Sequence, residues 1–484
     1  MSHMRLPFMP VTIRKEEHIM RLRRLKSLWI TLVIILVSCF CPFPAYAATT
    51  KVIVSAGIAD YVAIPMFETK HPEVKVAIES ISPLYSELAN KFIVQDSQID
   101  LYRLNAKLGI FQQLRAKGYF LDLSSNEIIE NFTKRMAEPF QDQLLLKNGK
   151  ILGVPSFFIL EYPILVNKNV ADAIGLSEEE FPSNILELLK FVNSWEENYG
   201  EEFPEYSPFR ADEASSYALA HRNPYIGFIL EIYKDTLRAQ KQPLQYNTSL
   251  FLELLGEIER WTYKNDQDYE TKVNNMPNYD QCLFYSFQAF DDDVLKLVCK
   301  GENCLNLPLT STSPIVQAYE LECAIVNPAT KDKKLAIELA QCYIEDCQPA
   351  LLRILCPTDS APYQAPDYQQ NLEELKKWRK EEEERLKSLG PEKNAEQKEL
   401  ISFIDSLIQD AMDNPYEISE YAISRYKTEI LPYLIPRGEG VYESEAIYAE
   451  TMSYTFQWLD GMISAETYTK KLDNFLKIAI IEND

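Results

Sequence analysis

The feature that most constrains the fold is an alternation of strand-like and helix-like segments that begins at residue 51. Residues 51–56 (KVIVSA) and 74–78 (VKVAI) are short runs rich in β-branched residues, and residues 61–70 between them have a helical pattern. The alternation continues through three further segments, a helix at 85–92, a strand at 99–104 and a helix at 110–117. This order predicts a parallel sheet covered by helices on both faces.

The chain is too long for one ordinary hydrophobic core, so 484 residues favour two lobes. Residues 162–167 (YPILVN) form a strand-like run that leaves the first unit, and we place a crossing between lobes there. Helical patterns then dominate, at residues 184–195, 224–239 and 250–264. The predicted domains are a leader at 1–47, a first α/β lobe at 48–157 plus 293–358, and a helix-rich second lobe at 158–292 plus 359–484.

Several later segments complete this organisation. A strand-like run at residues 282–287 (CLFYSF) leads back from the second lobe, and residues 305–309 and 324–327 read as strands that rejoin the first. Residues 367–389 are strongly charged, which predicts a solvated surface helix with Glu/Lys pairs one turn apart. A coiled-coil partner helix is the alternative for this C-terminal helical extension.

The N-terminal segment has the pattern of a secretory signal. A basic start between Arg21 and Lys26 precedes an apolar run at residues 28–40, which is shorter than the roughly 20 residues that span a bilayer. Ala45-Tyr46-Ala47 then predicts cleavage after Ala47 and a secreted or cell-surface location. Leu36-Val37-Ser38-Cys39 resembles a lipobox, so a lipoprotein anchored through Cys39 is the alternative.

Composition excludes several functions. The formal net charge of −23, with no basic stripe after residue 50, argues against nucleic-acid binding. Only two of the four histidines, His71 and His221, lie beyond the leader, which supplies His-based catalytic triads and metal sites poorly. No phosphate loop or dinucleotide fingerprint is present among the 14 glycines. The sequence therefore predicts no enzyme, no cofactor and no metal.

Seven cysteines cluster in one stretch of the chain, at positions 282, 299, 304, 323, 342, 347 and 356. Clustering in an exported protein suggests local disulfides, and Cys299 and Cys304 bracket a turn-like Lys-Gly-Glu-Asn. A zinc site is the rival, but its common two-residue spacing is absent here. The odd count leaves at least one thiol unpaired.

Four short stretches resemble bacterial extracellular solute-binding proteins of family 1, the group of maltodextrin- and oligosaccharide-binding proteins. They are residues 67–74 (FETKHPEV), 149–155 with 165–168 (GKILGVP and LVNK), 306–309 with 324–327 and 336–339 (NLPL, AIVN and AIEL), and 458–466 (WLDGMISAE). Leu339 stands where the family usually has Phe. The resemblance implies a two-lobed periplasmic-binding type II fold that closes on a ligand in the cleft.

That fold implies an ABC importer subunit that captures a small solute, and carbohydrate is the favoured cargo. The membrane subunits of the importer would be its partners, and the chain is expected to be a monomer. Peptide, polyamine or organic acid is the alternative cargo on the same fold. A secreted glycoside hydrolase that uses two carboxylates is the rival from another class.

Ligands of open α/β sheets bind beyond the carboxyl ends of strands, so residues after each strand are the candidate site. Aromatic rings would stack on a sugar face, while planar polar groups would hydrogen-bond its hydroxyls. Arg103 would alternatively clamp a carboxylate. The predicted ligand-binding residues are Asp60, Tyr61, Arg103, Asn105, Phe158, Glu161, Tyr285 and Ser311.

Overall fold

The structure is a computed structural model, and by its contacts the chain divides into two units, residues 1–51 and 52–484. The predicted signal segment, the cleavage site after Ala47, and Cys39 lie outside the described residues, as do Asp60 and Tyr61. Within the described part, no helix is both long enough and apolar enough to cross a bilayer. The described residues are 51–56, 63–79, 90–106, 108–211, 219, 222–263, 278–291, 293–295, 303–345, 347–388, 394–413, 415–437 and 445–483.

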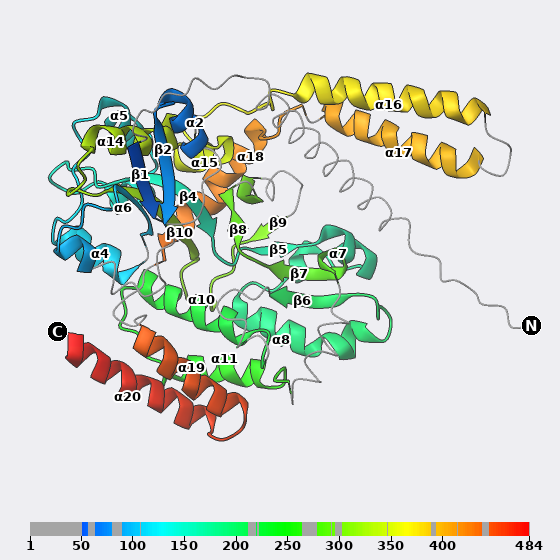
Figure 1. Ribbon diagram of the computed structural model, residues 1–484. Coiled ribbons are helices and arrows are strands. Elements are labelled where there is room, and N and C mark those ends of the chain that lie inside the picture. The colour runs from blue at the N-terminus through cyan, green and yellow to red at the C-terminus, as the bar shows by residue number, and fades with distance from the viewer. Residues whose placement is uncertain are drawn as a thin grey trace, which may run out of the picture. The chain divides into compact units, whose positions relative to one another are not determined.

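The described strands form two sheets (Figure 1). In the first, the order is β2-β1-β3-β10-β4-β8, with β11 beside β10, and in the second it is β6-β7-β5-β9. The strands of the first sheet are β1 (Lys51–Ala56), β2 (Val74–Glu79), β3 (Leu101–Asn105), β4 (Val154–Leu160), β8 (Ala289–Phe290), β10 (Gln317–Val326) and β11 (Leu434–Pro436). Those of the second are β5 (Ile164–Val166), β6 (Ser207–Ala211), β7 (Cys282–Ser286) and β9 (Asn303–Leu305).

The first sheet is mixed rather than parallel throughout. β1 runs parallel to β3, as the alternating pattern predicts, but β10 is antiparallel to both β3 and β4. The physical reason is the route of the chain. β10 follows β9 of the second sheet, so it enters the first sheet at the end where β4 leaves it and runs in the opposite direction.

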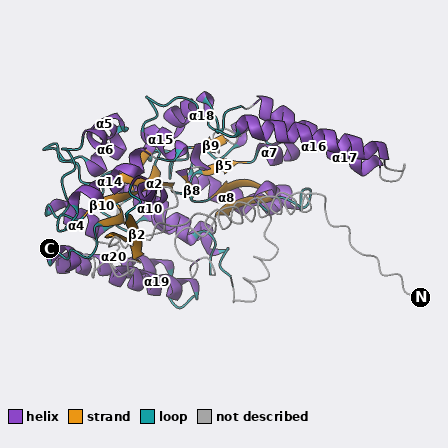
Figure 2. Ribbon diagram, turned by 45° about the horizontal axis from the view of Figure 1, so that its top comes forward, coloured by secondary structure: helices purple, strands orange, loops and turns teal. Residues whose placement is uncertain are grey.

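Helices cover both faces of the first sheet (Figure 2). Along β10, Tyr319, Leu321 and Cys323 enter one hydrophobic cluster, while Ala324 and Val326 enter another on the opposite face. This is the arrangement of an α/β protein, and it confirms the predicted class. The covering helices are α2 (Ala63–Lys70), α4 (Gly109–Ala116), α5 (Glu127–Arg135), α6 (Glu138–Leu144), α14 (Lys333–Glu345), α15 (Pro349–Leu355) and α18 (Glu420–Arg425).

The second sheet belongs to a separate hydrophobic cluster that is built mainly from helices. The C-terminal helix is fastened to it by Asp473, whose carboxylate accepts hydrogen bonds from the backbone N–H groups of Tyr246 at 2.6 Å and Asn247 at 3.0 Å. The helices of this cluster are α7 (Lys168–Ile174), α8 (Ile185–Trp195), α10 (Ile226–Ala239), α11 (Ser249–Glu259), α19 (Glu445–Leu459) and α20 (Ala465–Asn483).

The predicted charged helix is α16 (Tyr368–Ser388), which packs against α17 (Asn394–Asp413). Ion pairs one turn apart line its surface, such as Arg379 to Glu383 at 2.8 Å. The two helices lie side by side and extend away from both sheets (Figures 1 and 2). The solvated surface helix predicted from the sequence is therefore confirmed, and its partner is a helix of the same chain.

The predicted domain boundaries stay a prediction. Sheet membership differs from them at three short strands, because β9 belongs to the second sheet and β8 and β11 belong to the first. Of the expected cysteine pair, Cys304 on β9 carries a free thiol, and Cys299 lies outside the described residues. Cys323, Cys347 and Cys356 also carry free thiols.

Candidate functional site

The candidate site lies where the chain passes from one sheet to the other. β4 of the first sheet is followed by Glu161 and then by β5 of the second, while β7 of the second sheet is followed by Gln288 and then by β8 of the first. The backbone N–H of Glu161 donates to the carbonyl of Ala318 at 2.8 Å, which holds this crossing against β10. Glu161 and Gln288 are therefore fixed at the junction of the sheets.

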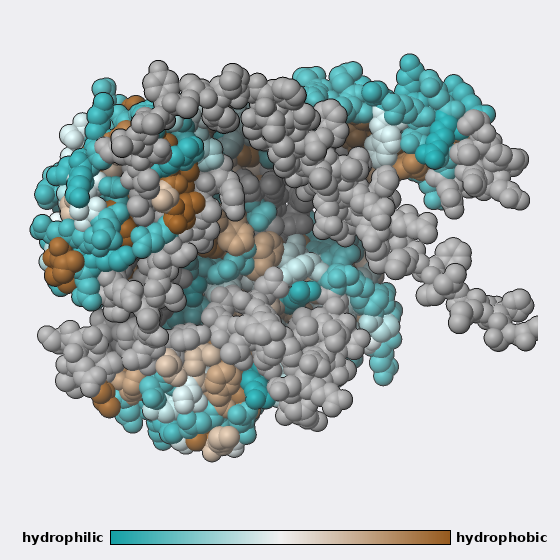
Figure 3. Space-filling model, in the orientation of Figure 1, coloured by the Kyte–Doolittle hydropathy of each residue, from teal (hydrophilic) through white to brown (hydrophobic). Residues whose placement is uncertain are grey.

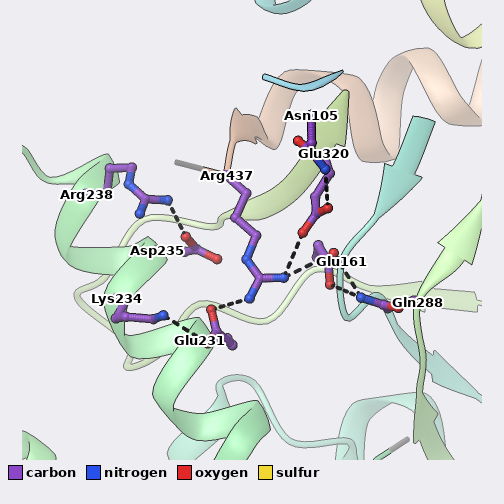
Figure 4. Close-up of polar contacts among 9 residues, drawn as sticks. All are labelled: Asn105, Glu161, Glu231, Lys234, Asp235, Arg238, Gln288, Glu320 and Arg437. Carbon is purple, nitrogen blue, oxygen red and sulfur yellow. Dashed lines mark hydrogen bonds and ion pairs between the residues drawn. The ribbon is translucent and has the colours of Figure 1, made fainter. Parts of the chain in front are cut away.

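A single buried arginine organises the junction. Arg437 follows β11, and its backbone N–H donates to the carbonyl of Tyr319 at 2.7 Å. Its Nη1 lies 3.1 Å from Oε1 of Glu161 and 3.1 Å from Oε1 of Glu320, and its Nη2 lies 2.5 Å from Oε2 of Glu231 (Figure 4). One guanidinium thus contacts carboxylates from a crossing, from β10 of the first sheet and from α10 beside the second sheet.

A second ring of polar groups surrounds these carboxylates. Gln288 Nε2 donates to both carboxyl oxygens of Glu161 at 3.1 Å, and Asn105 Nδ2 donates to Glu320 Oε2 at 2.6 Å. Lys234 Nζ lies 2.9 Å from Glu231 Oε1. We call this set the junction network; its members are Asn105, Glu161, Glu231, Lys234, Asp235, Arg238, Gln288, Glu320 and Arg437.

Glu231 and Asp235 belong to the network because they lie four residues apart on α10 and so share one face of the helix. Asp235 Oδ1 lies 2.7 Å from Arg238 Nη1. Burial raises the pKa of Asp235 to about 6, although Arg238 opposes this shift. Burial also acts to raise the pKa of Glu231, but Lys234 and Arg437 outweigh it and lower that pKa to about 2.

Glu161 is different, because burial dominates its titration. Only 2% of the residue is exposed, and burial raises the pKa of its carboxyl group to about 8. Arg437 opposes the shift, whereas the neighbouring Glu320 adds to it by its charge and by a hydrogen bond between the two side chains. Burial therefore favours the protonated form of Glu161, whereas Lys234 and Arg437 favour the ionised form of Glu231.

A small, partly open cavity adjoins the junction network. Glu161, Tyr162, Asp235, Thr236 and Gln317 supply its polar lining, and the rest is mainly aliphatic. Its volume is about 20 Å³. Pockets that hold drug-sized ligands measure roughly 300–1,000 Å³, so this cavity is too small for a sugar in this conformation. In the view of Figure 3 the surface is hollowed near the centre, between the helices at the upper left and those at the bottom.

The structure brings two of the predicted site residues together, Asn105 and Glu161, through Glu320 and Arg437. Arg103 lies nearby on β3 but is engaged elsewhere. It is buried, its Nη2 lies 3.0 Å from Glu322 Oε2, and its guanidinium lies 5.9 Å from the centre of the Tyr343 ring.

The predicted aromatic residues lie in packed surroundings. Phe158 has no exposed surface, and its ring is 5.7 Å from those of Phe140 and Tyr319, so it leaves no face for a ligand in this conformation. Tyr285 is 7% exposed and packs against Tyr279 and Phe287. Ser311 is exposed in a turn before β10.

Sequence reasoning missed the centre of the network. Arg437 follows a three-residue strand that the sequence does not reveal, and Glu231 and Glu320 lie inside an apolar helix and an apolar strand, not after a strand. A usable signal was present, because a glutamate within runs such as Ile229-Leu230-Glu231-Ile232 must find a partner when the run is buried. Such a pattern indicates that the glutamate has a cationic partner, but it does not indicate which Lys or Arg of the chain that partner is.

No protein-family model matches the chain, and no curated protein matches it. Among solved structures, it resembles the MsmE binding protein of Bacillus subtilis in an open conformation, with a TM-score of 0.53, 12% identity, and coverage of 90% of this chain and 98% of that one. It also resembles an ABC substrate-binding protein of Listeria monocytogenes in complex with cycloalternan (TM-score 0.51, 13% identity, 89% and 99% covered). A third is a Bacillus licheniformis sugar transporter protein in complex with stachyose (TM-score 0.51, 10% identity, 87% and 98% covered).

These likenesses define the fold as the two-lobed α/β fold of those structures. The two sheets with their separate hydrophobic clusters are the two lobes, and the junction network lies where they meet. The resemblance predicted from four short stretches is thus confirmed at the level of the fold.

Proposed function

We propose that this protein is the extracytoplasmic solute-binding component of an ABC importer and that it captures a carbohydrate between its two lobes. The observation that carries the proposal is the fold itself, in which two sheets are joined by several crossings at a buried polar junction. Structures with this fold include proteins crystallised with cycloalternan and with stachyose.

The polar groups at the junction suit a neutral, hydroxyl-rich ligand. Carboxyl groups and side-chain amides, such as those of Glu161 and Asn105, present planar pairs of hydrogen-bonding atoms that match neighbouring hydroxyl groups. A sugar would take over hydrogen bonds that these two side chains now make to Gln288 and Glu320. A carboxylate ligand fits less well, because Arg103 already pairs with Glu322 and Arg437 with three glutamates. Such a ligand would have to displace a buried ion pair. We therefore favour sugars over organic acids.

Capture follows from the two-lobe arrangement. A ligand that contacts both lobes stabilises the closed conformation by its additional contacts, and the importer would recognise that conformation. The protein binds and releases its cargo intact. Export through the N-terminal signal, cleavage after Ala47, and a monomeric state belong to the same proposal.

The test is a ligand screen of the exported protein by thermal shift, followed by calorimetry. Oligosaccharides, amino acids, short peptides, polyamines and organic acids form the panel. We expect an oligosaccharide class to raise the melting temperature and the other classes to leave it unchanged. Stabilisation by peptides or amines alone would defeat the carbohydrate assignment, and turnover of a sugar polymer would transfer the protein to the hydrolases.

Variants then locate the site. Asn105→Ala removes an amide at the junction and is expected to weaken sugar binding by about tenfold, the effect of one lost hydrogen bond to a buried group. Asn126→Ala is the matched control, since it removes an amide from the N-cap of α5. Equal affinities for the two variants would place the ligand elsewhere.

A further inference from the structure

The junction network occupies the place of a hinge. Glu161 lies on the crossing from β4 to β5, Gln288 lies on the return from β7 to β8, and Arg437 ends the last described segment of the first sheet before α19. Any rotation of one lobe against the other acts on these three residues. Glu231, on α10 of the second lobe, is tied to the same guanidinium.

The groups that face Glu161 come from the crossings, from β10, from α10 and from the segment after β11, and they include the buried phenol of the adjacent Tyr162, whose ring centre lies 5.8 Å from the Arg437 guanidinium. Arg437 Nη1 lies 3.1 Å from its Oε1, and Glu320 on β10 shares that nitrogen. Gln288 is neutral and donates to both oxygens. From α10, Glu231 reaches Glu161 through Arg437, and Asp235 lines the same cavity. Lys234 and Arg238 on α10 pair with those two carboxylates rather than with Glu161.

The charges at the centre do not balance unless one carboxyl group is protonated. One guanidinium contacts Glu161, Glu231 and Glu320, and these three side chains are at most 9% exposed. Lys234 offsets Glu231. If both Glu161 and Glu320 were ionised, two buried negative charges would share a single nitrogen, and like charges at such a distance disfavour joint ionisation.

We propose that Glu161 and Glu320 share one proton at the Arg437 guanidinium and that loss of this proton to solvent loosens the hinge. This regulation rests on the proposed function, because it adjusts the closure that captures the ligand. Below the pH at which this proton is lost, the carboxyl pair and Arg437 together carry no net charge, and the lobes stay close. Above it the pair carries one more negative charge, which is relieved when water enters between the lobes.

The titration of Glu161 is consistent with this assignment. Burial, with the charge of Glu320 and its hydrogen bond, raises the pKa of Glu161 to about 8 against the opposing effect of Arg437. Deprotonation therefore falls in the mildly alkaline range. The protein would hold its cargo more tightly in acidic or neutral surroundings and release it more readily in alkaline ones.

The experiment measures the distance between the lobes in the ligand-free protein as a function of pH. Spin labels are placed at Ser125, before α5 of the first lobe, and at Gln242, after α10 of the second, both of which are exposed. A ketone-bearing amino acid carries each label, because the chain contains nine cysteines. Double electron–electron resonance is recorded from pH 6 to pH 9.5.

We expect a longer and broader distance distribution at high pH, with a midpoint near pH 8. Glu161→Gln places an uncharged group of the same shape at this position, so its distribution should stay at the low-pH form throughout. Glu130→Gln is the matched control, because Glu130 lies on the surface and pairs only with Lys134 one turn away among its described contacts. That variant should follow the unmodified protein.

A distribution that does not change with pH would overturn the proposal, and so would a Glu161→Gln variant that shifts like the unmodified protein. The titration of the unmodified protein tests the idea even if Glu161→Gln fails to fold. Because no ligand is added, the outcome is separate from the proposed function. If the distance between the lobes changes with pH but no sugar binds, the proposed control of the hinge stands and the proposed carbohydrate ligand is wrong.

Discussion

Removing the guanidinium of Arg437 should destabilise the protein strongly. Side-chain exposures are 8% for Arg437, 0% for Glu161, 9% for Glu231 and 5% for Glu320, so the variant Arg437→Met leaves these carboxyl groups buried without their common cation. Breaking a buried ion pair from one side costs about 3–5 kcal/mol. The lower end applies here, because Glu231 keeps Lys234, Glu320 keeps Asn105 and Glu161 keeps Gln288.

Urea unfolding at pH 7.5 measures this loss, with Arg135→Met as the control. Arg135 and Asp359 form an ion pair at 3.2 Å with side-chain exposures of 48% and 47%, and an exposed pair contributes less than about 1 kcal/mol. A further signature is pH dependence. Carboxylates left without a cation take up protons in the native state, so the cost should shrink at pH 5. Equal losses for the two variants would refute the central place given to Arg437.

The remaining predictions address titration, packing and thiol chemistry. Because the pKa of Glu161 is raised, the free energy of unfolding should fall by about 1.4 kcal/mol per pH unit as the pH rises from about 4.5 towards 8, and unfolding curves of Glu161→Gln should lack this slope. Because the pKa of Glu231 is lowered, this residue should stabilise the fold above about pH 4.5 and lose that effect towards pH 2. Phe158→Ala should cost about 3–5 kcal/mol of stability, since its ring is fully buried, and unchanged stability with lost sugar binding would return it to the ligand site. Asp473→Ala should cost about 1–3 kcal/mol, because two backbone N–H groups lose their acceptor, and a protease-resistant α20 in that variant would contradict the reasoning. Burial raises the pKa of the Cys323 thiol well above its usual range and the side chain has no exposed surface, so maleimide should label it only after unfolding, and rapid labelling of the native protein at this residue would show that it is exposed.

Local pattern was enough to predict most of the elements. The strand at residues 51–56 coincides with β1, and the helix at 184–195 matches α8 within one residue, because their periodicity indicates a short strand and an amphipathic helix without reference to distant residues. The charged helix at 367–389 likewise matches α16 within one residue at each end. The direction of β10 could not be predicted, because alternation along the chain contains no information about the route by which a strand re-enters a sheet.

The sequence by itself determined the α/β class and the two-lobed organisation, and it singled out Glu161, directly before the predicted crossing at residues 162–167, as a candidate polar residue. Only the tertiary structure determined which side chains surround Glu161. Glu320, Glu231 and Arg437 are 159, 70 and 276 residues away along the chain. Each is a charged group in or beside an apolar element, which must be paired when buried, but its partner depends on how the two lobes close around the junction. A charged residue within an apolar run therefore indicates that a partner of opposite charge is required, but only the folded chain determines which residue that partner is.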